Sequence, residues 1–399
     1  MENEFEKGFI AGFLLNQHKS DTPDESTTDD KWEYPSNWLK LPEPAENQVI
    51  LLADNRGNHH NIYSSIKLSY IGRFSIVCTQ SVHIDWGDGS SDDISAKDNT
   101  VSHSYTAGSG HAADNSEQWI ITVTFDANAT DGTDYIKSLC YSEIYDMHFV
   151  AIKSGDVGYL FNSNQDSIPC SKSYVEYFKI CKGDSFKFSG AKYLKKLEFP
   201  RTVTKLPDRG LSGCISLIDV DLSNITEIGD YALNGCCALN PSGKMPKLIK
   251  AGKGAFYNSG ITGINFPCLS ETGTYTFYQC YKLEDIVIPE TLKTISELDF
   301  YNCLSLKTIK LSNVESIKLQ AFSGCCNLKK VESDKVTAIG DTVFNGCRSL
   351  TSVKLPSCNS LGFAAFGSCY ALSNCILQSG AEIGNAFRDC SSSLKITYV

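Results

Sequence analysis

The second half of the chain repeats one pattern of hydrophobic and polar positions about every 22 residues, beginning near residue 188. Each repeat has an aromatic or leucine position, a cysteine or serine three residues later and, in most copies, a leucine three residues after that. The first position holds Leu211, Leu233, Phe256, Phe277, Phe300, Phe322, Phe344, Phe366 and Phe387, and the second holds Cys214, Cys236, Ser259, Cys280, Cys303, Cys325, Cys347, Cys369 and Cys390. Nine copies in register identify a repeat protein.

A unit of this length cannot bury a core alone, so the copies must stack and share one. After the leucine, an alternating hydrophobic run predicts a strand whose copies form a parallel sheet, about 4.8 Å apart. The repeat at Leu233 has "NPSGKMPK" instead of this run, which predicts a distorted strand or a short insertion. The third and fifth positions, counted from the leucine, should face outward and form the candidate binding surface. They are Asp219, Asp221, Asp285, Val287, Thr308, Lys310, Lys330, Glu332, Ser352 and Lys354.

Residues 48–128 show a shorter period that indicates β structure. "SIKLSYI", "RFSIVCTQ", "VHIDWG" and "WIITVTFDA" are rich in β-branched and aromatic residues that partly alternate with polar ones. The cluster "WGDGSSDD" supplies the residues of a tight turn. We therefore expect a small β-sandwich over 48–128 and the repeat array over 188–399. Residues 129–187 are expected to be either a connecting segment with further strands or the N-terminal cap of the array.

The N-terminal residues 1–19 place Phe5, Phe9 and Phe13 four residues apart, which predicts a short amphipathic helix. This helix could dock on a partner, pack on its own chain or lie on a membrane surface, and its few basic residues disfavour the third role. Residues 20–47 begin with the acidic "SDTPDESTTDD", which predicts a flexible tether. The tryptophans and prolines that follow predict an extended segment lying against a domain.

The repeat resembles the BspA-like class of leucine-rich repeat, also called the Treponema pallidum type. The signature of that class reads approximately A-F-x-x-C-x-x-L-x-x-I-x-L-P-x-x-[IV]-x-x-I-G, and the copy from Phe322 to Phe344 fits it almost position by position. The resemblance covers about half of the chain. It implies an open, curved solenoid, used as an extracellular or surface recognition platform. The chain as a whole is therefore expected to be mainly β, with a small immunoglobulin-like sandwich before a solenoid of about nine coils.

The N-terminal part carries a second resemblance. "VHIDWGDGSSDD", "VSHSYT" and "WIITVTF" together resemble the polycystic-kidney-disease-type (PKD) immunoglobulin-like domain. The residues on its motif positions are Trp86, Gly87, Asp88, Gly89, His103 and Tyr105. "PSNWLKLP" with the WGDG segment also resembles tail-associated proteins of bacteriophages and prophages.

These resemblances imply a protein of the virion tail that binds a protein or glycan on the host surface. Its N-terminal helix would dock on a tail, a baseplate or another assembly partner. The alternative is a bacterial cell-surface adhesin that leaves the cell by a non-classical route.

Charge and hydropathy narrow the class of protein. The net charge of -10 argues against nucleic-acid binding, which needs a basic face. No window reaches about 18 continuous apolar residues, so no transmembrane helix is expected. The acidic start differs from the basic start of a signal peptide, so the seventeen cysteines, made in a reducing cytosol, should mostly stay thiols.

Four roles are open to the repeated cysteines. Zinc binding is disfavoured because the chain has no C-x-x-C pair, and thiol catalysis because all seven histidines precede residue 149. Disulfides between stacked coils would have to join Cβ atoms that point in parallel and stay one strand spacing apart. Ser259 favours the fourth role, structural packing, because a position that accepts serine needs a small side chain that donates to a backbone carbonyl.

Four aspartates crowd the WGDG turn, namely Asp85, Asp88, Asp92 and Asp93. Clustered carboxylates could hold calcium, but turn chemistry within a solvated acidic loop is the favoured interpretation. No nucleotide-binding loop, serine-hydrolase elbow, zinc-protease motif or paired-carboxylate motif occurs. We therefore expect no cofactor, no metal and no enzymatic activity.

Overall fold

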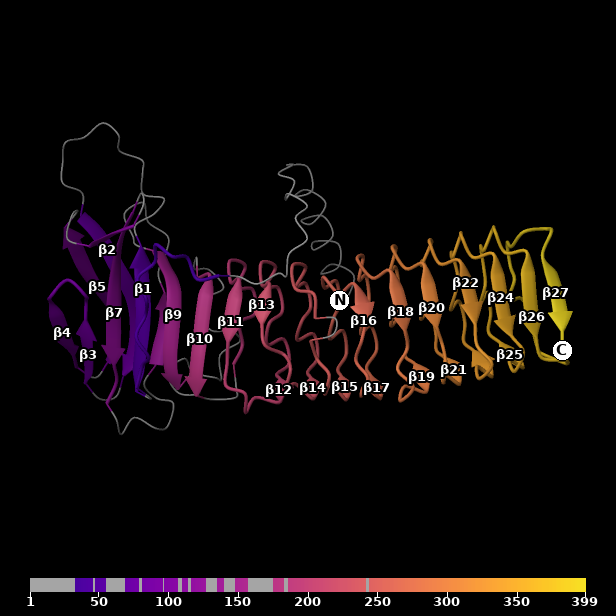
Figure 1. Cartoon of the computed structure of the whole chain (residues 1–399), viewed down its shortest axis with the longest axis horizontal. Helices are drawn as coiled ribbons and strands as arrows, with labels where there is room; N and C mark the ends of the chain where they lie inside the picture. The colour runs from indigo at the N-terminus through magenta and orange to yellow at the C-terminus, as the bar shows by residue number, and fades with distance from the viewer. Residues whose placement is uncertain are drawn as a thin grey trace, which may run out of the picture. The chain divides into compact units, whose positions relative to one another are not determined.

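The computed structural model describes residues 33–45, 47–54, 69–78, 81–95, 97–106, 110–113, 116–126, 135–139, 148–156, 175–182, 186–241 and 244–399. Within these residues the fold is all β, without an α-helix (Figure 1). The predicted helix over 1–19 and the acidic tether over 20–30 lie outside the described residues.

The N-terminal strands form two sheets. The larger sheet takes from this region β1 (Gln48–Asp54), β3 (Val82–Asp85), β4 (Ser91–Ile94), β6 (His111–Ala113), β7 (Ser116–Thr124) and β9 (His148–Asp156). The smaller sheet consists of β2 (Ser69–Cys78), β5 (Lys97–Thr106) and β8 (Tyr135–Leu139). Antiparallel pairing joins β1 to both β7 and β9, and joins β2 to both β5 and β8.

This pairing changes the predicted boundary at residue 128. Both β8 and β9 follow that residue, yet they pair with β2 and β1 from before it. The strands of 135–156 therefore complete the N-terminal sheets, and β9 also borders the first coils. The sequence did not reveal this, because strand pairing depends on partners that are far apart in the chain.

The larger sheet continues into the array. Strand β9 pairs in parallel with β10 (Tyr177–Lys182), which pairs in parallel with β11 (Lys196–Glu198), and β11 with β13 (Asp219–Val220). Strand β9 therefore pairs antiparallel with β1 on one edge and in parallel with β10, the first strand of the stacked coils, on the other. One hydrogen-bonded sheet links the N-terminal strands with the first coils.

Residues 33–45, called the strap here, contain a turn at Pro35–Trp38 but no strand, and they cover one face of this sheet. Trp38 and Leu41 are buried against Ile50, Leu52 and Tyr177. Strand β1 is hydrophobic at consecutive positions because the strap covers one of its faces and the main core the other.

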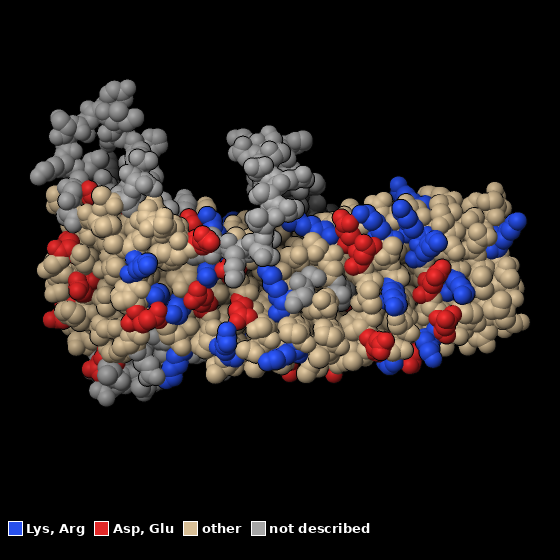
Figure 2. Space-filling model, viewed as in Figure 1, with Lys and Arg blue, Asp and Glu red and all other residues tan. Residues whose placement is uncertain are grey.

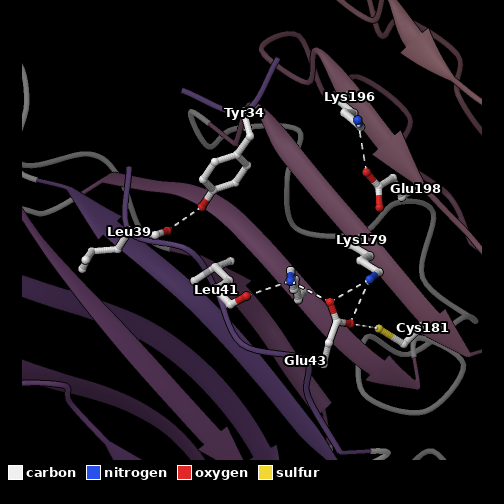
Figure 3. Close-up of polar contacts among 9 residues, drawn as sticks. Tyr34, Leu39, Leu41, Glu43, Lys179, Cys181, Lys196 and Glu198 are labelled. Atoms are coloured by element: carbon white, nitrogen blue, oxygen red, sulfur yellow. Dashed lines mark hydrogen bonds and ion pairs between the residues drawn. The ribbon is translucent and has the colours of Figure 1, made fainter. Parts of the chain in front are cut away.

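Polar contacts hold the end of the strap (Figure 3). The Lys153 ammonium donates to the Leu41 carbonyl at 2.8 Å and to the Glu43 carboxylate at 2.9 Å, and Lys179 donates to the same carboxylate at 2.8 Å. The hydrogen bond from Lys179 is the largest cause that lowers the pKa of Glu43 to about 2. The strap, which was predicted to lie against a domain, thus links β9 to β10 through the Glu43 carboxylate.

The array stacks coils that each contribute up to two short strands (Figure 1). One sheet consists of β16 (Gly263–Ile264), β18 (Asp285–Val287), β20 (Thr308–Lys310), β22 (Lys330–Glu332), β24 (Ser352–Leu355), β26 (Asn374–Leu377) and β27 (Lys395–Tyr398). The second strand of each coil belongs to one of two four-stranded sheets. These are β12 (Lys205–Leu206), β14 (Glu227–Ile228), β15 (Lys250–Ala251) and β17 (Glu271–Thr272), and β19 (Thr294–Ile295), β21 (Ser316–Ile317), β23 (Ala338–Ile339) and β25 (Ser360–Leu361).

Two features of the repeat follow directly from its sequence. The aromatic position forms a column of rings from Phe256 to Phe387, in which neighbouring centroids lie 4.9–5.3 Å apart and the rings are nearly parallel. The larger sheet, which has nine strands in all, ends at β13. The seven-stranded sheet of the array begins at β16. The described residues of the "NPSGKMPK" segment between them form no strand. The predicted distortion of that coil is confirmed.

Candidate functional site

The outward positions of the seven-stranded sheet form two rows. The burial pattern of β18, β20 and β22 alternates exposed, buried, exposed, because successive side chains of a strand point to opposite faces. The parallel register aligns these positions from strand to strand. The first row contains Asp285, Thr308, Lys330 and Ser352, and the second contains Val287, Lys310, Glu332 and Lys354.

The same register adds residues that the prediction did not include. Asn374 follows Ser352 in the first row, and Ile376 follows Lys354 in the second. The signal was available, because the same count from Leu372 reaches both positions. The rows extend in this way to Lys395 and Thr397 of β27.

Two predicted residues lie elsewhere. Asp219 belongs to β13 of the nine-stranded sheet, where its carboxylate lies 3.2 Å from the Lys196 ammonium. Asp221 follows β13 and accepts a hydrogen bond from the backbone N–H of Ser223 at 3.0 Å, and the hydrogen bonds from Ser223 lower its pKa. The break in the sheet separates this pair from the other eight residues.

At the β18 edge of the rows, opposite charges pair. The Lys307 ammonium lies 2.7 Å from the Glu284 carboxylate, and this hydrogen bond is the largest cause that raises the pKa of Lys307. The Thr308 hydroxyl donates to Asp285 at 2.6 Å. Such exposed contacts orient side chains but add little stability.

A column of half-buried tyrosines in the array was not predicted. Tyr257, Tyr278 and Tyr301 stack with centroid distances of 4.7 and 4.9 Å. Each follows the aromatic position of its coil, so the recurring Phe-Tyr pairs were the available signal.

The repeated cysteines point at one kind of acceptor. In the eight coils with cysteine, Sγ lies 3.0–3.4 Å from the backbone carbonyl oxygen of the aromatic or leucine position one coil earlier, as in Cys347 with Phe322. Ser259 makes a different contact, because its hydroxyl lies 3.7 Å from the Cys280 thiol. Burial raises the pKa of Cys214 and Cys280 to about 12, which keeps these thiols protonated. The fourteen cysteines whose side chains the structure describes are free thiols.

The four aspartates of the WGDG turn have separate hydrogen-bond partners. Asp85 accepts from the Gly87 backbone N–H, Asp92 from the Trp86 indole, while Asp88 and Asp93 each lie 2.8 Å from a histidine ring nitrogen. Among the described residues, no group of three or more His, Cys, Asp or Glu side chains could hold a metal ion.

The PKD-like motif residues do meet in space. The His103 ring stacks on the Trp86 indole with centroids 4.9 Å apart, and its Nε2 lies 2.8 Å from the Asp88 carboxylate. The buried Tyr105 hydroxyl donates to the Trp86 carbonyl at 2.9 Å. These contacts fix the turn to the strand that carries His103 and Tyr105.

Stacked coils with a continuous core and two exposed rows define an all-β solenoid, which presents a surface along its length. The family model described as "BspA type Leucine rich repeat region" matches residues 179–272 and 270–395 in six copies, which is more than half of the chain. The chain therefore belongs to this family, as its repeat predicted. Leucine-rich-repeat proteins are generally interaction scaffolds rather than enzymes.

The chain also resembles solved structures of leucine-rich repeat proteins at low identity. A leucine-rich repeat protein from Bacteroides ovatus is 20% identical, covers 68% of this chain and 96% of its own, and has a TM-score of 0.38. A leucine-rich cell surface protein from Faecalibacterium prausnitzii is 20% identical, with coverage of 67% and 91% and a TM-score of 0.34. The leucine-rich repeat protein of T. pallidum is 20% identical, with coverage of 60% and 82% and a TM-score of 0.26. No curated protein matches the sequence.

The part of the chain that the structure describes contains no helix with the length and apolar character of a membrane span.

Proposed function

We propose that this chain is a non-enzymatic recognition protein that binds a protein or glycan on a cell surface through the two exposed rows of the seven-stranded sheet. The observation that supports this role is the alignment of outward side chains on consecutive strands. A repeat array gains most from such alignment when it binds an extended or repetitive ligand, because each coil adds one equivalent contact.

For its setting, we propose the tail of a bacteriophage or prophage, with the array as the receptor-binding part. The support is the resemblance of "PSNWLKLP" and the WGDG segment to tail-associated proteins. The PKD-like strands would then act as a spacer between the tail and the array. The second candidate is a bacterial cell-surface adhesin, and the family match over 179–395 favours it.

Two measurements test these proposals. Labelled protein should bind a subset of bacterial or host cells, and the variant Thr308→Trp/Ser352→Trp should lose that binding because bulky rings would block the first row. The matched variant Thr337→Trp/Ser360→Trp should retain it, because both residues are exposed at the second strands of the coils that carry β22 and β24, outside the two rows. Equal binding by both variants would show that the rows are not the binding face.

The setting is tested by fractionating a culture after prophage induction. Co-sedimentation of the chain with tail particles supports the phage role, and recovery on the envelope of uninduced cells supports the adhesin.

A further inference from the structure

Basic side chains gather on one part of the rows, over β20, β22 and β24. Lys310, Lys330 and Lys354 are exposed on these three neighbouring strands. Exposed Lys329 and Arg348 lie beside them in the two coils that carry β22 and β24. Figure 2 shows basic and acidic side chains interspersed on the face of the array that it presents.

The acidic side chains near these lysines do not match them in number. Glu332 is the acidic residue of the rows over these three strands. Asp334, at the corner after β22, is followed by Lys335, and residues 342–381 contain neither aspartate nor glutamate. Within the described part of the chain, Lys310, Lys330 and Lys354 form no ion pair, whereas Lys307 pairs with Glu284. This basic patch stands out in a chain whose net charge is -10.

The spacing and the neighbours of the basic patch indicate what it would bind. Lys310 and Lys354 lie two strands apart, which is about 10 Å at the usual strand spacing. Hydroxyl and amide side chains surround the lysines, namely Thr308, Ser352 and Asn374 in the first row and Thr351 and Ser373 beside it. Spaced cations among hydroxyl and amide groups suit a polymer that carries both negative charges and many hydroxyls.

We propose that the basic patch binds an acidic polysaccharide, one whose sugars carry carboxylates, laid across β20, β22 and β24. The lysine ammonium groups would pair with the carboxylates, and the serine, threonine and asparagine side chains would hydrogen-bond the sugar hydroxyls. This inference rests on the proposed function, since it names the ligand class of the same rows.

The test measures binding of the full chain to labelled polygalacturonic acid and to the same polymer with its carboxyls methyl-esterified. The acid should bind at least about tenfold more tightly than the ester, and its affinity should fall as salt is raised, because exposed charge pairs are screened. The variant Lys310→Glu/Lys330→Glu/Lys354→Glu should lose at least about tenfold in affinity. The matched variant Lys293→Glu/Lys318→Glu/Lys335→Glu has the same net charge as this triple variant, but its three exposed substitutions lie outside the rows. It should bind the polymer as tightly as the parent does.

Other outcomes contradict the proposal. Equal affinity for acid and ester would remove the carboxylate from recognition, and equal loss in both triple variants would mean that net charge alone is sensed. Poly-glutamate or duplex DNA binding as tightly as the acid would assign the patch to another class of polyanion. If the tryptophan variant abolishes cell binding while the lysine reversals and salt leave it unchanged, the rows are the binding face but their ligand is not acidic. If the protein binds no cells at all, the proposed function is wrong, and the acidic-polysaccharide proposal that rests on it is wrong too.

Discussion

At the scale of single residues, Asp299 departs most from the repeat. It occupies the position before the aromatic residue, where most coils have alanine, and it is fully buried. Its carboxylate accepts hydrogen bonds from the Thr276 and Ser296 backbone N–H groups at 3.0 and 3.1 Å and from the Thr272 hydroxyl at 2.8 Å. Burial is nevertheless the largest influence and raises its pKa to about 6 from the ordinary 3.8.

This raised pKa predicts a pH-dependent stability. Between pH of about 4 and 6 the folded chain holds a proton on Asp299 that the unfolded chain releases, so this residue's contribution to the free energy of unfolding falls as pH rises. The loss is at most about 3 kcal/mol, from the size of the pKa shift. Urea denaturation of the parent and Asp299→Ala at pH 4.5 and pH 7 should show the parent losing its advantage at the higher pH.

The control for this measurement is Asp334→Ala, because Asp334 is exposed. The pH dependence found for Asp299→Ala should exceed that of this exposed control. A parent advantage over Asp299→Ala that grows with pH would show that the three hydrogen bonds outweigh burial and hold the carboxylate ionised.

At the scale of the element, the column of cysteines explains why one small residue type recurs. A cysteine is small enough for a buried coil interior, and its thiol reaches the carbonyl of the preceding coil. The hydroxyl of Ser259 does not make that contact and faces Cys280 instead. The C–O bond is shorter than the C–S bond, so serine extends less far and buries less apolar surface.

Restoring the column should therefore stabilise the array. Ser259→Cys is expected to raise the free energy of unfolding by about 1 kcal/mol, and Cys303→Ser to lower it by about 1–2 kcal/mol. Both are measured by urea denaturation in the presence of a reductant. Cys326→Ser, at a half-buried position outside the column, should change little. Stabilities that respond equally at Cys303 and Cys326 would contradict a role for the column geometry.

The repeat elements are also where the sequence was most informative. The spacing of Phe322, Cys325 and Leu328 determines the buried column, the strand and its register, because every coil repeats the same local environment. The second strand of each coil was missed, since pairs such as Ala338–Ile339 are too short to show a period of two. The row residues of β26 and β27 were not predicted, because the outward positions were counted only as far as Lys354.

At the scale of the whole molecule, one hydrogen-bonded sheet contains both N-terminal strands and strands of the first coils. The sequence predicted a separate sandwich, a connecting segment and an array, because composition changes between those ranges. It did not reveal that β9 pairs antiparallel with β1 on one edge and parallel with β10 on the other. The ion pairs of Glu43 with Lys153 and Lys179 join residues more than one hundred positions apart, which no local pattern encodes.

The shared sheet and its strap should make the two parts unfold together. Trp38 is 5% exposed and packs over both β1 and the start of β10, so Trp38→Ala should cost about 3–5 kcal/mol. Hydrogen exchange followed by mass spectrometry should then show faster exchange in β1, β9 and β10 alike. Leu394→Ala, which removes a partly buried side chain in the last coil, should leave exchange in these strands unchanged. Faster exchange confined to β1 and β9, with β10 still protected, would mean that the N-terminal strands open independently of the array despite the hydrogen bonds between them.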